Sequence, residues 1–241
     1  MNVSEERLRL VIFGASNIVS DLFDCALANH LVPAKVVIDL PEDSSERSIP
    51  VAVRAARLAP ICPPPVIEPL HAFRPAAGEV YLLGPTTPTR ARLAGELQDR
   101  FDLRFHTLVH PTAYVSPLAT IGAGTFVGAR SVIAAGAAID EHVFINRGAT
   151  IGHDTSIGSF SRIQPGSNVG GLSRLGRGVT VGIGATLIER LVVGDNAVIG
   201  AGSTVLDDVP ANVVVVGAPA RVLKSVAKPV FQSDAAEPTA W

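Results

Sequence analysis

"RGATIGHDTSIGSFSRIQPG", residues 147–166, repeats with a period of six residues, so that Ile151, Ile157 and Ile163 are evenly spaced. Six fits neither the 3.6-residue turn of an α-helix nor the two-residue alternation of a strand. The period describes a short strand and a turn that recur as one unit. The charged pair His153-Asp154 stands inside one of these units and needs a separate explanation.

The repeat continues through the second half of the chain. From residue 115 to residue 205, sixteen positions spaced six apart are all Val, Ile or Leu. The residue two positions earlier is Ala, Ser or Thr in thirteen units, and the next residue is Gly in nine. Residues two apart on a strand share a face, so both the aliphatic and the small residue are expected to point inward. At 18 residues per coil, the 91 residues predict about five coils of a triangular parallel β-helix, which is a solenoid.

The turn residues of the repeat are expected to lie at tight corners with positive φ. They are its glycines together with Asp140, Asn146, Asp195 and Asn196. Residues 207–223 break the period with Pro210 and Pro219, which predicts a departing strand and a short capping helix over the end of the solenoid. The small and polar residues from Ser225 onward predict a loose tail.

Residues 1–107 lack the repeat and predict an α/β domain. Apolar runs over 7–14 and 34–39 flank a segment with helical spacing over 17–30, which together predict a β-α-β unit. A second unit has a strand over 79–84, a helix over 85–101 with Thr87 as N-cap and Pro88 in its first turn, and a strand over 103–109. The proline-rich stretch over 41–75 is expected to form loops around one short strand or helix.

Parallel α/β sheets bind ligands beyond the carboxyl ends of their strands. Backbone N–H groups at the start of the helices suit phosphate oxygens, and an acidic side chain after the second strand suits a ribose or base. The candidate substrate-binding residues are therefore Gly14, Ser16, Asn17, Asp39, Gly84 and Thr86. The alternative is that these loops are ordinary strand-to-helix turns, because "GASNIV" lacks the GxGxxG spacing. Ser16 or Asn17 would then only cap a helix.

Composition and charge indicate which partners and which cellular compartment to expect. The formal charge of −2 and the pI of about 6.3 argue against a nucleic-acid partner. The acidic start and the absence of an apolar run near 20 residues predict a protein that is cytoplasmic and has no membrane partner. Cys25 and Cys62 stand in unrelated contexts, which predicts buried free thiols in a reducing compartment.

Three motifs carry a resemblance to a known family: "LVHPTAYVSP" at 108–117, the repeat segment at 147–166, and "VVVGAPAR" at 214–221. The chain resembles the sugar O-acyltransferase family of hexapeptide-repeat proteins, typified by sialic acid O-acetyltransferases, and is similar to N-acetyltransferases of nucleotide-linked amino sugars. The resemblance implies a small Rossmann-like domain (1–107), a left-handed parallel β-helix (108–224) and a flexible tail (225–241). It also implies a homotrimer that uses acetyl-CoA, without a metal, on a sugar or sugar-nucleotide acceptor.

By the same resemblance, His153 is the catalytic base and Asp154 supports it. Acetyl-CoA lies in a groove between two β-helices and contacts Arg162, Gly171, Ile183, Ala201 and Gly217. Where the family often has a second histidine, this chain has Arg162. Where the first turn of the family is a glycine-rich run with a histidine, this chain has Asn17, Ile18 and Val19.

The chemistry of "GHD" fits acyl transfer from a thioester. The attacking amine or hydroxyl must lose a proton, which imidazole accepts near neutral pH, and a neighbouring carboxylate fixes the imidazole tautomer. The alternative is a solvated corner without catalytic role. Of the other histidines, His142 is expected on the surface, and His110 in a capping or packing role.

Two rival functions stay open at this point. A metal-dependent hydratase or carbonic anhydrase needs about three convergent ligands, whereas the repeat supplies only His142 and His153. The second rival function is that of a solenoid that binds a sugar nucleotide without catalysis. The sequence leaves open whether nitrogen or oxygen is acylated, which sugar is the acceptor, and how long the acyl group is.

Overall fold

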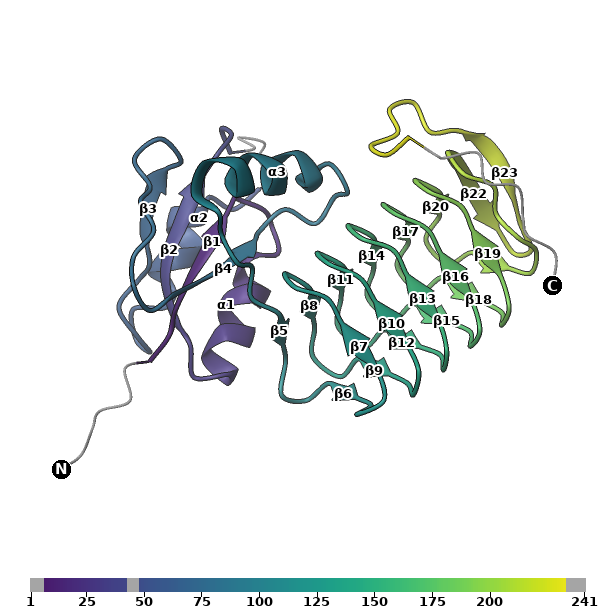
Figure 1. The fold of residues 1–241 in the computed structure, drawn as a ribbon, viewed down its shortest axis with the longest axis horizontal. Helices are drawn as coiled ribbons and strands as arrows, with labels where there is room; N and C mark the ends of the chain where they lie inside the picture. Colours follow the sequence, from purple (N-terminus) through teal and green to yellow (C-terminus); the bar gives the residue numbers. More distant parts are fainter. Residues whose placement is uncertain (1–6, 43–47, 233–241) are drawn as a thin grey trace.

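The computed structural model describes residues 7–42 and 48–232, which form an N-terminal α/β domain beside an elongated solenoid (Figure 1). The α/β domain holds a parallel four-stranded sheet in the order β3-β2-β1-β4. Its elements are β1 (Arg9–Phe13), α1 (Val19–Ala28), β2 (Val32–Ile38), α2 (Val51–Ala56), β3 (Val66–Pro69), β4 (Glu79–Leu83) and α3 (Arg90–Phe101).

Both faces of this sheet are covered. Leu10 and Ile12 of β1 pack in one cluster with residues of α1 and α2, whereas Val11 and Phe13 pack in another with residues of α3. Alternate residues of a strand point to opposite faces, so β1 must be apolar throughout. The proline-rich stretch forms one short helix, α2, and one short strand, β3.

Two predicted elements of this domain differ in the structure. Helix α3 begins at Arg90 rather than at residue 85, and Thr89 is the N-cap, without a side-chain hydrogen bond; the hydroxyl of Thr87 lies 2.7 Å from that of Thr89. The predicted strand over 103–109 is divided: Phe105 alone bridges to Tyr81, and β5 (Leu108–Val109) joins the solenoid. The reason is that Leu108 packs against solenoid aromatics between the two domains.

The solenoid is a parallel β-helix with three sheets, which confirms the triangular coil. Its five-stranded sheet contains β7 (Thr120–Ile121), β10 (Ala138–Ile139), β13 (Ser156–Ile157), β16 (Arg174–Leu175) and β19 (Val192–Val193). Its six-stranded sheet contains β6 (Tyr114–Val115), β9 (Val132–Ile133), β12 (Thr150–Ile151), β15 (Asn168–Val169), β18 (Thr186–Leu187) and β21 (Thr204–Val205).

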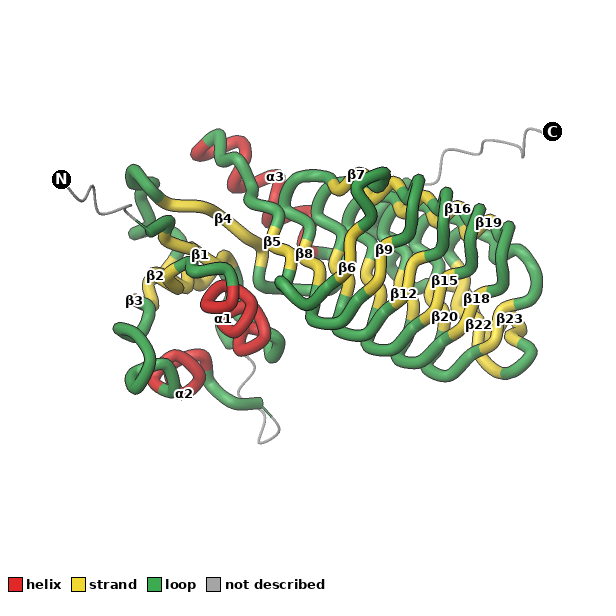
Figure 2. The backbone as a smooth tube through the Cα atoms, turned by 90° about the horizontal axis from the view of Figure 1, so that it is seen from below, coloured by secondary structure: helices red, strands yellow, loops and turns green. Residues whose placement is uncertain are grey.

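Its eight-stranded sheet contains β5, β8 (Phe126–Val127), β11 (Phe144–Ile145), β14 (Arg162–Ile163), β17 (Thr180–Val181), β20 (Val198–Ile199), β22 (Val213–Gly217) and β23 (Ala220–Ser225). Paired strands from β5 to β21 are 18 residues apart, as Ile139 with Ile157. Figure 2 shows the coils stacked along the long axis of the solenoid.

The interior is filled as the repeat predicts. The aliphatic residues from 127 to 205 form one buried cluster, and Ala149, Thr155 and Ser161 are fully buried. The buried hydroxyls are hydrogen-bonded: Thr155 Oγ1 donates to Gly170 O at 3.0 Å and Ser161 Oγ to Gly176 O at 2.9 Å. Serine and threonine are accommodated inside because each hydroxyl reaches a carbonyl of the next coil.

The corners correct one expectation. Positive φ occurs at every sixth residue, three positions after the aliphatic one, as at Gly148, Asp154 and Phe160. Of the four predicted Asp and Asn residues, only Asn196 is in this conformation. The glycine directly after the aliphatic residue has another cause, because a Cβ on Gly182 would lie 2.5 Å from the backbone nitrogen of Ala201. Adjacent coils approach too closely there for a side chain.

The C-terminal end also differs. A β-hairpin, β22 and β23, replaces the predicted capping helix, because Val213–Gly217 pairs with the last coil and Ala220–Ser225 returns antiparallel to it. Residues 226–232, predicted as a loose tail, fold back along the solenoid (Figure 1). Asn196 Oδ1 accepts hydrogen bonds from the nitrogens of Val230 and Phe231, each at 3.0 Å. The rest of the predicted tail, 233–241, lies outside the described residues.

The two domains share a continuous core. Phe126 and Phe144 stack with ring centroids 4.8 Å apart on the outer face of the eight-stranded sheet, and they pack in the same cluster as Leu22 and Phe23 of α1. Asn29 Nδ2 donates to Val109 O at 2.9 Å across the junction. The α/β domain is therefore held against one sheet of the β-helix.

Candidate active site

Four-residue turns, here called corners, join the strands of each coil. Equivalent corners of successive coils stack in three rows along the β-helix, and these rows are used to describe the site. The His142 row contains corners 122–125, 140–143, 158–161, 176–179 and 194–197. The His153 row contains corners 134–137, 152–155, 170–173 and 188–191. The Ile183 row contains corners 128–131, 146–149, 164–167, 182–185 and 200–203.

His153 and Asp154 project from their corner into solvent as a pair. Nδ1 of His153 lies 2.8 Å from Oδ2 of Asp154, and both side chains are more than half exposed. An ionised carboxylate only accepts, so Nδ1 is the donor, and in the neutral imidazole the lone pair is then on Nε2. Asp154 has a φ of 53°, the left-handed conformation that Asp tolerates better than most residues. The imidazole and the carboxylate thus form a hydrogen-bonded pair that solvent can reach.

The neighbouring coils shape this pair. Gly171 lies on the next coil beside the imidazole, where a Cβ would be 2.7 Å from His153 Nε2. Gly136 lies on the preceding coil, where a side chain would collide with Oδ1 of Asp154. Both side chains of the pair therefore lie against glycines of the neighbouring coils. The family resemblance implies that Gly171 contacts CoA, and the structure adds that Gly171 lies against the His153 imidazole.

The predicted CoA-binding residues are spread over the molecule. Gly171 belongs to the His153 row, while Ile183 and Ala201 are exposed on the Ile183 row. Gly217 lies at the end of β22 in the hairpin. Arg162 lies on the outer face of the eight-stranded sheet, where its Nε donates to Thr180 Oγ1 at 3.1 Å, and burial lowers its pKa. Within one chain these residues do not form one surface.

The α/β domain contains a pocket of about 380 Å³ at the carboxyl ends of its strands. Three of the predicted substrate-binding residues, Ser16, Asn17 and Asp39, line it. Its other lining residues come from loops and helices around it, among them Pro41, Glu42, Ile49, Pro85, Thr87, Thr89, Arg90 and Arg92. Gly14, Gly84 and Thr86 belong to the two loops that frame the pocket but do not line it.

The predicted substrate residues have distinct structural tasks. Ser16 Oγ donates to Gly84 O at 2.7 Å, which joins the two pocket loops, and Asn17 Oδ1 accepts from Arg54 Nη2 at 2.9 Å. Neither side chain caps α1. Gly14 has a φ of 83°, and a Cβ on Gly84 would collide with Gly14 O, so these glycines allow the loops to touch.

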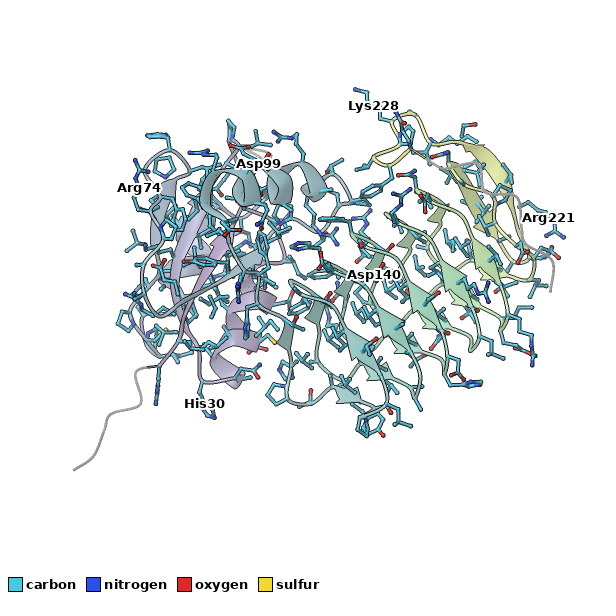
Figure 3. All side chains as sticks on the ribbon, viewed as in Figure 1. His30, Arg74, Asp99, Asp140, Arg221 and Lys228 are labelled. Atoms are coloured by element: carbon cyan, nitrogen blue, oxygen red, sulfur yellow. The ribbon has the colours of Figure 1, made fainter. Side chains whose placement is uncertain are left out.

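The sequence did not reveal the residues that meet at the junction of the two domains. His142 is buried, contrary to its predicted surface position, because its ring stacks on Phe160 at 4.8 Å and meets the edge of Phe105 at 4.6 Å. Burial, and then the charge of Arg90, lower the pKa of His142 to about 4. Figure 3 labels Asp140, the first residue of this corner, and Asp99, on the exposed side of α3. Only the fold brings Arg90 and His142 together.

Other predicted residues have simpler surroundings. His110 Nδ1 lies 2.9 Å from Thr112 Oγ1, in keeping with a packing role at the first coil. Cys25 is buried and free, with a pKa raised to about 12 by burial, whereas Cys62 is free but only half-buried.

Among the described residues, no group of three or more His, Cys, Asp or Glu side chains is arranged to hold a metal ion. In residues 7–42 and 48–232, no helix is long and apolar enough to cross a bilayer.

Comparison with known proteins defines the class. Residues 173–207 match the family model described as bacterial transferase hexapeptide (six repeats). The second half of the chain is thus a left-handed β-helix of hexapeptide repeats, the architecture of the hexapeptide transferases.

Two solved structures are similar to this chain over most of its length. The chain is 27% identical to the acetyltransferase domain of PglB from Neisseria gonorrhoeae, solved in complex with acetyl coenzyme A, over 90% of this chain and 100% of that one, with a TM-score of 0.74. It is 23% identical to GDP-perosamine N-acetyl transferase from Caulobacter crescentus, solved with CoA and GDP-perosamine, over 93% and 100% of the chains, with a TM-score of 0.76; this second likeness shows the fold alone.

A curated relative matches a shorter segment. The 2,3,4,5-tetrahydropyridine-2,6-dicarboxylate N-acetyltransferase of Clostridium perfringens is 50% identical over 42 residues, which are 17% of this chain and 18% of the relative. The match therefore spans less than a fifth of that enzyme and is confined to a part of it.

Proposed function

We propose that this protein is an acetyltransferase that moves the acetyl group of acetyl-CoA to an amino or hydroxyl group of a nucleotide-linked sugar, with His153 as general base. One observation carries the proposal: His153 and Asp154 form a hydrogen-bonded pair with Nε2 unoccupied by Asp154, on a β-helix of the transferase type. The likeness to the acetyltransferase domain of PglB, which was solved with acetyl coenzyme A, supports the donor.

The proposed mechanism uses three groups of this chain. His153 Nε2 takes the proton from the acceptor amine or hydroxyl as that atom attacks the thioester carbonyl. Asp154 holds the tautomer and stabilises the imidazolium. The N–H of Gly171 has no hydrogen-bond partner within the described residues and lies beside His153, where it is available to the developing oxyanion. The new bond to the acetyl carbon forms, the C–S bond breaks, and His153 returns its proton to the leaving sulfur.

The acceptor is assigned to the pocket of the α/β domain, residues 1–107, and acetyl-CoA to the β-helix, residues 108–224. The pocket combines an acidic side chain, Asp39, with backbone near the start of α1 and α3, which suits a ribose or base and phosphates. Arg162, Gly171, Ile183, Ala201 and Gly217 remain the proposed CoA contacts. Free thiols fit a cytoplasmic location.

The separation of these parts supports a homotrimer. The α/β domain rests on the eight-stranded sheet and the His142 row, whereas His153 lies on a different row of corners. The proposed CoA contacts are likewise divided between the His153 row, the Ile183 row, the eight-stranded sheet and the terminal hairpin. A closed ring of three chains would bring the His153 row of one copy against the acceptor pocket and the Ile183 row of another.

The test is release of CoA from acetyl-CoA by the purified full-length protein with a panel of nucleotide-linked amino sugars and free sugars. Acetylation of at least one nucleotide-linked sugar, with product mass increased by one acetyl group, is expected. Light scattering in the same buffer gives the oligomeric state. Binding of sugar nucleotides without acetyl transfer would favour the non-catalytic solenoid.

A further inference from the structure

Arg90 connects the acceptor pocket to the β-helix. It is the first residue of α3 and is only 4% exposed. Its Nη1 donates to Thr86 O at 2.6 Å, and its Nη2 donates to His142 O and, at 3.1 Å, to Ser161 O. Thr86 belongs to the pocket loop between β4 and α3, while His142 and Ser161 belong to successive coils of the solenoid. One guanidinium thus joins three segments that are far apart in the sequence.

Burial explains why a donor is needed here. His142 is buried under the α/β domain, and a buried backbone carbonyl requires a hydrogen-bond partner. Arginine suits the place because its planar guanidinium presents five donors in fixed directions, whereas the lysine ammonium is a single point. The Arg90 guanidinium also lies over the Phe160 ring, 5.8 Å from its centroid.

The contribution of Arg90 is geometric rather than that of an ion pair. Within the described residues, no carboxylate lies within ion-pair distance of Arg90. Burial, and then the nearby charge of Arg162, lower the pKa of Arg90 to about 9. The hydrogen bonds of the guanidinium go to carbonyl oxygens, one in the pocket loop and two in the β-helix, so that they tie the loop to the β-helix.

Arg90 also lines the acceptor pocket, together with Pro85, Thr87 and Thr89 of the same loop. An acyl acceptor must be held within a fraction of an ångström of its productive position for efficient transfer. The base lies on the rigid β-helix, and the acceptor pocket lies in the other domain. A displacement of the loop relative to the β-helix would therefore misplace the acceptor.

We propose that Arg90 is a positioning residue, which fixes the pocket loop, residues 84–89, against the β-helix and so sets the place of the acceptor relative to the catalytic corner. The catalytic consequence rests on the proposed function. The attachment of the loop does not, and it is tested separately.

The first experiment measures amide hydrogen exchange in the full-length protein without ligands. In Arg90→Met, the loop amides of Gly84 and Arg90, which donate to Phe13 O and Thr87 O, are expected to exchange at least about tenfold faster, while residues 150–157 are unchanged. Arg100→Met is the control, because Arg100 lies on the same helix in an exposed pair with Glu96. Wild-type exchange of the loop in Arg90→Met would overturn the proposal. Arg90→Lys, which keeps the charge, provides a folded variant should Arg90→Met be unstable, and it too should loosen the loop.

The second experiment uses the acceptor found in the sugar-nucleotide panel. Arg90→Met should lower kcat/KM for the acceptor about 100-fold or more and Arg90→Lys by less, with the Kd of acetyl-CoA within twofold of wild type and Arg100→Met unaffected. A loosened loop with wild-type turnover would refute the positioning role. Failure of the wild-type protein to acetylate any sugar would defeat the proposed function alone, because the exchange experiment still decides whether Arg90 holds the loop.

Discussion

The imidazole of His153 lies against Gly171 of the next coil, so closely that a methyl group on Gly171 would be 2.7 Å from Nε2. Asp154 holds the opposite side of the ring through Nδ1 at 2.8 Å. The orientation of the proposed base is thus determined by a carboxylate on one side and by the absence of a side chain on the other.

Gly171→Ala should impair catalysis without unfolding the protein. The added methyl group must displace the exposed imidazole rather than a backbone atom. We expect kcat to fall about tenfold or more, within the range for a misplaced general base. Steady-state kinetics together with thermal unfolding provide the check, and Gly95→Ala on α3, where the added Cβ meets no atom within 4 Å, is the control.

His153→Asn should lower kcat by roughly 10²–10⁴ and leave the Kd of acetyl-CoA nearly unchanged, because a general base acts in the transition state. Asp154→Asn should cause a smaller loss. Ser159→Ala, at the same position of another corner, is the matched control. Near-wild-type turnover by His153→Asn on the true acceptor would reduce the pair to a solvated corner.

Asp39→Asn should weaken the acceptor and leave the donor unaffected. Asp39 lines the pocket of the α/β domain, and its carboxylate is the proposed partner of a ribose or base. We expect KM for the acceptor to rise about tenfold, in line with the loss of one hydrogen bond to a charged group. Asp99→Asn, on the exposed side of α3, controls for the change in charge. An unchanged KM would place the acceptor elsewhere.

Two glycines of one corner should respond differently to alanine. Gly182→Ala brings a Cβ to 2.5 Å from Ala201 N, between coils that cannot separate, whereas Gly184 has open space but a φ of 64°. Gly184→Ala should cost about 1–2 kcal/mol for the left-handed conformation, and Gly182→Ala about 3 kcal/mol or more for overpacking. Urea unfolding would compare them. Equal losses would mean that conformation, rather than space, selects both glycines.

Stability should decrease with acid through His142. Its pKa is about 4 when folded and near 6.5 when unfolded, so the unfolded state binds more protons between these values. The contribution is fully present above pH 6.5 and is lost as pH falls towards 4, by about 1–2 kcal/mol between pH 7 and pH 5.

Urea unfolding of the wild type and of His142→Asn at pH 7 and pH 5 measures this contribution, and the variant should show the smaller decrease. Asparagine is chosen because it tolerates the φ of 55° at this corner. His30→Asn is the control, since His30 also has a positive φ but is exposed. Identical decreases in wild type and His142→Asn would show that the buried imidazole is not responsible.

The sequence by itself determined the β-helix. A spacing of six residues fixes which side chains point inward, because strand alternation and coil stacking are local and regular, and Ile151, Ile157 and Ile163 are buried as predicted. The GHD pair was also found from sequence, since a charged pair within an apolar repeat is visible without any structure. Its catalytic role remains a prediction.

Only the tertiary structure decided what covers the corners. The same corner position holds His142 buried under the α/β domain and Asp154 exposed, although the repeat treats both alike. Arg90 meets His142 across 52 residues, and Phe231 meets Asn196 across 35. Such contacts depend on how one domain and one terminal segment pack on a finished solenoid, and no local period in the sequence records that packing. For this reason the β-helix could be predicted from a six-residue pattern, while the junction between the α/β domain and the β-helix could not.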